Sequence, residues 1–487
     1  MLKFQNKIPS ALTIGGKEVE RVRMMNEIVW EKVSEPVDVD YFYIENLYAG
    51  QNTLTLTTSK SSRTPSELHT TSVEYSKDKN NWTTITFGNT DYSRQTITID
   101  EGEKVYFRND SGKWNQFYTG ADFFYVYFNT SQDCGAGGDV RSLLNFENIN
   151  NVGLTHSCFY SLFYDCVKLT DVSNLKLPAT TLADGCYEGM FRWCSSLTTA
   201  PALPATTLTK NCYYNMFSGC SSLTTAPTLP ATTLADSCYK EMFSSCTGLT
   251  SAPTLPATTL ADYCYQDMFY SCTSLTSAPQ LPATNLVTYC YSGMFYNCTS
   301  LTQAPELPAT TLATYCYSNM FYNCTSLTQA PELPATTLAT YCYSGIFSSC
   351  TGLTSAPTLP ATTLADSCYF NMFQGCSSLT QAPELPATTL ADSCYFNMFY
   401  RCSSLTQAPE LPATTLTSSL ATYCYYGMFR DCTSLTSAPT LPATNLVNYC
   451  YSNMFSGCTS LTTAPELPAT TLADNCYYQM FYNCTGL

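Results

Sequence analysis

The sequence predicts an α/β solenoid of 26-residue coils, built from short parallel strands and short helices and preceded by an all-β sandwich domain. A unit of the form LPATTLADSCYFNMFQGCSSLTQAPE, here residues 359–384, recurs through the C-terminal part of the 487-residue chain. Before this array, short runs rich in β-branched and aromatic residues alternate with turn residues. A fixed period of roughly 20–50 residues is typical of stacked repeats, and it outweighs the separate domains that chain length alone suggests.

Residues 1–35 are predicted to be an N-terminal β-hairpin attachment segment. The runs ALTI and EVERVRMM flank the turn at Gly15 and Gly16, and EIVWE follows. Gly-rich turns between such runs favour hairpins. The segment is too small to hold a core alone, so we expect it to dock on a neighbour or a partner chain.

Residues 36–131 are predicted to form an Ig-like β-sandwich. Seven short runs, from YFYIENL to FFYVYFN, are separated by turn signals such as Glu101-Gly102. Val105 and Phe107 alternate with Lys104 and Arg108, which indicates one buried and one solvated face. The aromatic residues of this region, with Trp82 and Trp114, are predicted to pack in the core or across strands; a sugar-binding platform is the alternative.

Residues 132–176 are predicted to be a junction and a degenerate capping repeat. The run GAGGDV, residues 135–140, is expected to be flexible. The segment SCFYSLFYDC that follows departs from the repeat consensus. Terminal repeats of solenoids commonly depart from consensus because they cap the stack.

Residues 177–487 are the array, and each coil is predicted to contain one short helix. In the unit above, Asp366 suits an N-cap, and Cys368, Met372 and Cys376 follow at i, i+4 and i+8. With Tyr369 and Phe373 they would make one apolar face of a helix of about ten residues. Such a helix is marginal alone and needs its neighbours.

The segment Leu-Thr-x-Ala-Pro-x-Leu-Pro of each coil is predicted to be extended chain. Proline excludes helix at the residue before it and cannot donate to a β ladder, so we expect very short parallel strands centred on Leu-Thr-x-Ala. One strand and one helix per coil describe a leucine-rich-repeat type of solenoid. Helices are wider than the spacing of strands, so the strand side is expected to be concave.

The cysteines follow the repeat rather than a disulfide framework. Thirteen pairs, each eight residues apart, account for 26 of the 27 cysteines, and only Cys134 stands outside them. Free cysteine commonly packs as a small buried hydrophobe, so the main interpretation is a column of reduced thiols. Bridges between neighbouring coils are the alternative; the spacing does not fit a zinc site.

Two positions that flank Ala-Pro vary while the frame around them stays fixed. On the predicted concave face they could form a column of amides and carboxylates suited to a glycan or a basic protein; solvated residues that vary neutrally are the alternative. The column comprises Gln303, Glu306, Gln329, Glu332, Gln381, Glu384, Gln407, Glu410 and Glu466. Exposed tyrosines of the predicted helix, such as Tyr270, Tyr296, Tyr322 and Tyr400, are an alternative contact surface.

Composition excludes several classes of function. The net charge is −15, only 12% of residues are charged, and no basic cluster occurs, so nucleic acid and anionic membranes are poor partners. No apolar run reaches the ~20 residues of a membrane span, and the N-terminus lacks the apolar region of a secretory signal. Phosphate-binding, nucleophile-elbow and zinc-protease motifs are absent, and the two histidines are far apart in sequence. No cofactor and no enzymatic activity are expected.

The repeat resembles the BspA-like (Treponema-type) leucine-rich repeats, whose units carry A-F-x-x-C-x-x-L before a strand. Met372, Phe373, Cys376 and Leu379 match this pattern, with Met for Ala and a longer coil. The resemblance covers residues 158–487 and implies surface adhesion and partner binding. The N-terminal sequence TIGGKEVERVRMMNEIVWE also resembles the start of gut bacteriophage virion appendage and tail fibre proteins.

These resemblances favour a non-enzymatic appendage on the virion surface of a bacteriophage. In this hypothesis residues 1–35 contact other virion proteins, and the array binds a host cell-surface glycan or protein, without membrane insertion and with homo-oligomerisation as a possibility. A bacterial cell-surface BspA-like adhesin is the alternative. A glycan hydrolase would need paired carboxylates in a cleft, which one glutamate per coil does not supply.

Overall fold

The structure is a computed structural model that divides the chain into two compact units, Met1–Asp40 and Tyr41–Leu487. It describes the backbone of residues 12–14, 17–19, 21–24, 27–31, 39–61, 71–87, 93–109, 118–119, 122–416 and 421–487. Within the first unit, β1 (Leu12–Ile14) pairs antiparallel with β2 (Lys17–Val19). The strands β3 (Arg21–Met24) and β4 (Glu27–Glu31) form a second antiparallel pair, with a register shift at Val22.

The second unit begins with two sheets. One has the order β14-β13-β5-β10-β7-β8, and the other has the order β11-β12-β6-β9. Their strands are β5 (Phe42–Asn46), β6 (Asn52–Ser61), β7 (Thr71–Ser76), β8 (Thr83–Phe87), β9 (Arg94–Ile99), β10 (Lys104–Arg108), β11 (Tyr118–Thr119), β12 (Asp122–Thr130), β13 (Cys134–Asp139) and β14 (Leu169–Lys176).

Aromatic rings from the two sheets meet in one core. The ring of Phe128, from β12, lies 5.4 Å from that of Phe42 and 5.0 Å from that of Phe107. Val105 and Phe107 are buried while Lys104 and Arg108 are not, which confirms the alternation predicted for this strand. Trp82 packs against Tyr41, and the Arg108 guanidinium lies 4.0 Å above its ring, so this ring is not an open sugar platform. Trp114 lies outside the described residues.

The glycine-rich junction is a buried strand, and the expectation that residues 135–140 are flexible is wrong. β13 is buried throughout and joins the sandwich to the array, because it pairs antiparallel with β5 and parallel with β14. Its glycines allow this close approach. A Cβ on Gly138, where φ is +76°, would lie 2.0 Å from the Tyr41 carbonyl oxygen.

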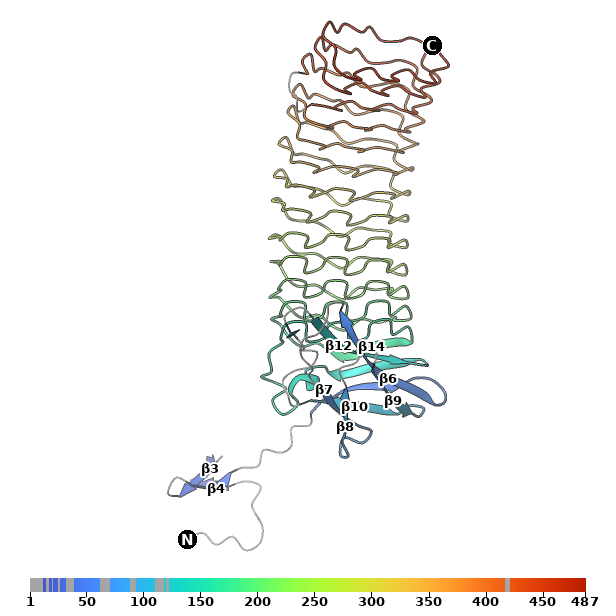
Figure 1. Cartoon of the computed structure of the whole chain (residues 1–487). Helices are drawn as coiled ribbons and strands as arrows, with labels where there is room; N and C mark the ends of the chain where they lie inside the picture. The colour runs from blue at the N-terminus through green and yellow to red at the C-terminus, as the bar shows by residue number, and fades with distance from the viewer. Residues whose placement is uncertain are drawn as a thin grey trace. The chain divides into compact units, whose positions relative to one another are not determined.

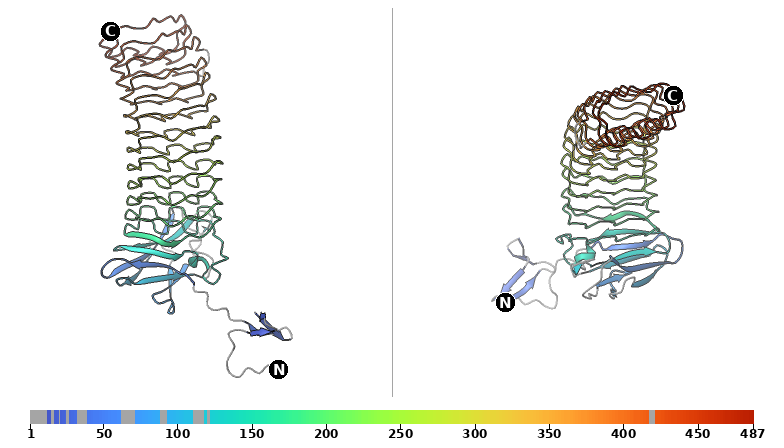
Figure 2. Two further views of the ribbon diagram at one scale, coloured as in Figure 1. Left: turned by 180° about the vertical axis from the view of Figure 1, so that it is seen from behind. Right: turned by 45° about the horizontal axis from the view of Figure 1, so that its top comes forward.

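The degenerate first coil packs into the sandwich core. The ring of Phe163 lies 6.0 Å from that of Phe42 and 5.4 Å from that of Phe191, which belongs to the next coil. From there the coils stack one upon another toward the C-terminus, and the three views show a stack with little curvature (Figures 1 and 2). Phenylalanine rings of successive coils stack at 5.3–5.8 Å along the column from Phe163 to Phe481.

The predicted helix is absent from the described coils, and a flat ribbon of turns stands in its place. Among the residues that the structure describes, the only α-helix is α1 (Ser142–Asn145). We call turn ribbon the ten residues from the one before the first cysteine to the second cysteine of a coil, 367–376 for example. Every fourth residue of this ribbon has a positive φ, here Ser367, Asn371 and Gly375 at +52°, +54° and +74°. Residues in this left-handed region cannot continue a right-handed helix.

Hydrogen bonds in the turn ribbon alternate between two kinds of partner. Every second N–H donates within the coil, as Met190 N does to the Tyr187 carbonyl at 3.2 Å. The others donate to the next coil, as Tyr187 N does to the Cys212 carbonyl at 3.0 Å. The ribbon therefore depends on its neighbours for half of its backbone pairing, which a helix would not.

The strand prediction is confirmed in direction but not in length. Isolated parallel bridges join single residues of neighbouring coils, such as Ser277 with Gln303 and Gln381 with Gln407. Because both sides of each coil consist of thin chain hydrogen-bonded to the next coil, nothing makes one side wider than the other. The predicted concave face is therefore wrong: curvature in such solenoids requires a helical layer, and the described coils have none.

All 27 cysteines are free thiols, and all but Cys484 are buried. From Cys194 onward, the Sγ of the second cysteine of each pair donates a hydrogen bond to a phenylalanine carbonyl of the preceding coil, as Cys376 does to Phe347 at 3.1 Å. This contact adds a polar link between coils inside an apolar column.

Candidate partner-binding faces of the array

No group of three or more His, Cys, Asp or Glu among the described residues is placed to hold a metal ion. A search of the described helices finds none that is long and apolar enough to cross a membrane. The surfaces that the coils present outward are therefore the candidates for function.

The first candidate is the amide and carboxylate column predicted from the sequence. All nine of its residues are exposed. Through their backbone, Gln303, Gln329, Gln381 and Gln407 take part in the parallel bridges, which aligns these residues with their counterparts in the neighbouring coils. The structure brings together two adjacent glutamate pairs, Glu306 with Glu332 and Glu384 with Glu410, whereas Glu466 follows Thr440 and has no glutamate in the coil before it.

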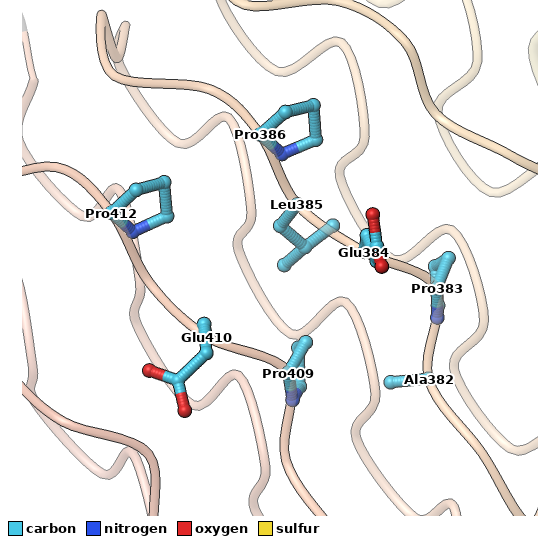
Figure 3. A pocket seen from close by; sticks show the side chains of 8 residues that line it. All are labelled: Ala382, Pro383, Glu384, Leu385, Pro386, Pro409, Glu410 and Pro412. Atoms are coloured by element: carbon cyan, nitrogen blue, oxygen red, sulfur yellow. The ribbon is translucent and has the colours of Figure 1, made fainter.

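Prolines frame the carboxylates of this column. A shallow pocket of about 330 Å³ is lined by Glu384 and Glu410 with prolines of both coils, and the two carboxylates lie between the rings (Figure 3). Two similar pockets, of about 300 and 270 Å³, repeat the arrangement with one glutamate and with none. The Thr440 hydroxyl donates to Glu410 at 3.0 Å, as that of Thr358 does to Glu332 at 2.9 Å. This face offers proline surface with intermittent negative charge.

The second candidate is the outward face of the turn ribbon. Cys368, Tyr369, Met372, Phe373 and Cys376 point inward and are almost completely buried, and residues at the same positions of the other coils except the last do likewise. The remaining positions point outward and carry most of the variation between coils. On this face tyrosines of successive coils stack into ladders, such as Tyr289 with Tyr315 at 4.5 Å and Tyr296 with Tyr322 at 4.4 Å.

The tyrosine ladders present their edges and hydroxyls rather than their faces. The rings of Tyr289, Tyr315 and Tyr341 are within 7° of parallel, so each ring covers the next. Partial burial, followed by the neighbouring tyrosines, raises the pKa of Tyr289 and of Tyr315. The same two causes raise the pKa of Tyr296, in the other ladder, to about 12, so its hydroxyl is neutral and able to donate.

The apolar spacing predicts a helix for these residues, and for that reason the tyrosine face is predicted only as an alternative contact surface. A helix advances about 100° per residue, so a strict four-residue repeat would drift around it. The chain instead keeps Cys, Met and Cys at four-residue spacing, with Gly, Asn, Asp or Ser at most of the positive-φ positions between them. These residue types, recurring every fourth position, are the signal that could have indicated turns.

A solenoid of thin coils with buried cysteine and phenylalanine columns defines a class of repeat proteins, and comparison with known families identifies it. The BspA type leucine rich repeat region matches residues 157–302, 237–406 and 347–487. The chain belongs to this family, as the resemblance noted in its sequence predicted.

Other comparisons add little. No curated protein matches the chain. Among solved structures, the crystal structure of a TLR13–ssRNA13 complex matches with 12% identity and a TM-score of 0.22, covering 65% of this chain and 53% of that one. The chain thus spans about half the length of that solved protein.

Proposed function

We propose that this protein is a non-enzymatic adhesin-type binding protein, specifically a virion-exposed fibre or decoration protein of a bacteriophage that binds a host cell surface through its array. The observation that carries the proposal is the array itself. A fixed buried frame of cysteine, tyrosine, methionine and phenylalanine holds outward positions that differ from coil to coil. Repeat proteins use such extended faces for recognition.

Two further features support the proposal. Family membership favours surface adhesion over catalysis. The first unit, Met1–Asp40, is a compact unit of its own and contains two antiparallel strand pairs, which suits attachment to other virion proteins. The amide and carboxylate column remains a proposed contact for a basic or hydroxyl-rich partner. A bacterial cell-surface adhesin is the second candidate, favoured by the same family membership.

Location decides between the two candidates. Antibodies raised against residues 177–487 should label purified phage particles in immunogold electron microscopy, and particle-bound protein should resist washing. Label on bacterial cell walls but not on particles would refute the phage proposal and favour the adhesin. Deletion of residues 1–35 should abolish incorporation into particles while the purified array still binds host cells.

A further inference from the structure

The outward face of the turn ribbon varies in chemical class from coil to coil. The residue two positions after the first cysteine of the ribbon is Glu188, Lys240, Ser318 or Phe370 in different coils. The position after Ala-Pro varies as well, among Ala, Thr, Gln and Glu, whereas the position before Ala-Pro holds only Thr, Ser or Gln and the return segment Pro-Ala-Thr-Thr is nearly constant. Both faces therefore vary, but only the turn-ribbon face carries aromatic residues at its variable positions.

Eight consecutive coils build one continuous aromatic ridge on this face. We define the aromatic ridge as Tyr263, Tyr289, Tyr315, Tyr341, Phe370, Phe396, Tyr423, Tyr426 and Tyr449. Neighbours along it contact at ring distances of 4.5–6.4 Å.

The ridge continues through coils whose usual tyrosine is missing. Ser367 and Ser393 replace that tyrosine, and in the same two coils Phe370 and Phe396 supply the ring three residues later. Packing alone could explain stacked rings, since such pairs contribute about 0.5–1.5 kcal/mol each. Packing explains less well why the two coils that lack the tyrosine before the first cysteine carry an aromatic ring three residues later instead.

The centre of the ridge is uncharged. No lysine or arginine occurs from residue 241 to residue 400, and from 268 to 365 the only acidic residues are Glu306 and Glu332, on a different segment of the coil. Beside the ridge lie Ser, Gly and Asn, and a second tyrosine ladder of Tyr270, Tyr296 and Tyr322. Tyrosine, serine, glycine and asparagine are the residues that antibody combining sites use, because they give contact area and adaptable hydrogen bonds at low entropic cost.

We propose that the aromatic ridge and the second tyrosine ladder bind an uncharged polysaccharide through the edges and hydroxyls of the tyrosines. The proposal rests on the proposed function and names its ligand class. From Tyr289 to Phe396 the chain holds no lysine or arginine to pair with an anionic ligand, and the Lys240 ammonium lies only at the start of the ridge, 5.7 Å from the ring of Tyr263. A cationic ligand would be drawn to the glutamate column instead. Because the ring faces are covered by neighbouring rings, recognition uses hydrogen bonds to the hydroxyl groups of the glycan rather than stacking on its sugar rings.

The test replaces ridge tyrosines with the residue that the chain itself uses at this position. Tyr289→Ser, Tyr315→Ser and Tyr341→Ser are combined in one variant; Ser237, Ser367 and Ser393 hold the same position with the same positive φ. The matched control is Asn211→Ser with Asn475→Ser in the full chain, because these asparagines hold the same ribbon position with positive φ in coils outside the aromatic ridge. Circular dichroism and thermal melting check that both variants fold.

Binding is measured to immobilised neutral polysaccharides, namely mannan, dextran and neutral galactan, and to the neutral capsular glycan of host cells. We expect the variant with the three ridge tyrosines replaced to lose about tenfold or more in affinity, because aromatic anchors dominate such interfaces, and the asparagine-to-serine control to bind as the wild type does. Binding should change little from about 50 mM to about 200 mM salt, unlike charge-driven association. Unchanged binding by the folded variant with the three ridge tyrosines replaced would overturn the proposal.

Cell adhesion separates this proposal from the proposed function. Adhesion that is lost after periodate oxidation of host glycans and kept after protease treatment supports the glycan ligand. Adhesion that is lost after protease treatment and kept after periodate overturns it in favour of a protein receptor, and leaves the adhesin function standing. Failure of the wild-type protein to adhere to any cell would overturn both.

Discussion

At the scale of single residues, the buried cysteines of the array are protonated, unreactive thiols. Burial raises the pKa of Cys350 to about 12, and it raises that of Cys376 well above the ordinary thiol value. A buried thiol with a raised pKa carries almost no thiolate near neutral pH and is therefore inert. The repeated cysteine is thus a packing and hydrogen-bonding residue in this fold rather than a redox centre.

Alkaline pH should unfold the array steeply. A thiol whose folded pKa is raised binds its proton more tightly in the folded state, so its contribution to stability is intact below the unfolded pKa and is lost as pH rises toward the folded pKa. Each such thiol loses about 1.4 kcal/mol per pH unit in that window. Most of the 26 buried thiols share a raised pKa, Cys166 being an exception, so one pH unit is enough to exceed the usual stability of a domain.

We therefore expect the protein to unfold between about pH 9 and pH 10 under reducing conditions. Intrinsic tyrosine fluorescence and thiol titration would monitor this transition. Native protein at neutral pH should expose about one thiol to an alkylating reagent, Cys484, and denatured protein all 27 without added reductant. A native protein that remains folded well above pH 11, or denatured protein with fewer reactive thiols, would contradict the buried-thiol account.

At the scale of the element, the turn ribbon is what sequence reasoning missed. The inward residues Cys368, Met372 and Cys376 were correctly predicted to be buried, because a period near four places them on one side in a helix and in a ribbon alike. The backbone conformation was not correctly predicted, because in a segment this short the spacing of apolar residues alone cannot distinguish a period of 3.6 residues from a period of 4.0. Asn371 and Gly375 carried the missing information, since both occupy positive φ.

Gly375→Ala distinguishes a ribbon from a helix directly. In a helix this change would stabilise the protein by about 0.5–1 kcal/mol. In the ribbon φ is +74°, so alanine should destabilise by about 1–2 kcal/mol, although its Cβ would meet only ordinary contacts with Ser349. Urea unfolding of the two proteins measures the difference. Gln374→Ala, one residue earlier and with negative φ, serves as the control and should change stability little; stabilisation by Gly375→Ala would refute the ribbon.

At the scale of the whole molecule, the array behaves as a one-dimensional stack in which each coil depends on its neighbours. The repeat period, the family and the columns of inward-pointing residues were all predictable, because the same residues recur at the same positions in twelve coils. The absence of curvature was not predictable, because it depends on the thickness of the turn ribbon, for which the apolar spacing wrongly predicted a helix. The buried strand β13 was missed for a related reason: its glycines suggest flexibility until the backbone of β5 is known to lie against them.

Removing whole coils should shorten the protein without unfolding it. Deletion of residues 291–342 joins Cys290 to Tyr343 and preserves the repeat frame. We expect a folded protein whose maximum dimension in small-angle scattering falls by about 10 Å, since each coil adds about one strand spacing.

Deletion of residues 317–329 removes half a coil and serves as the contrasting variant. It leaves the ribbon and bridge segments out of register and should therefore lower the melting temperature sharply. Equal stability of the two deletion variants would argue against stacked coils.

Far-UV circular dichroism of the reduced protein tests the central claim most directly, because the account depends on coils without helices. The described residues contain only the four-residue helix Ser142–Asn145, so the spectrum should lack the α-helical double minimum and be dominated by turns and extended chain. A helix of about ten residues in each coil would instead make roughly a quarter of the chain helical. A spectrum with that helical content would contradict the turn ribbon and, with it, the outward face on which the binding proposal rests.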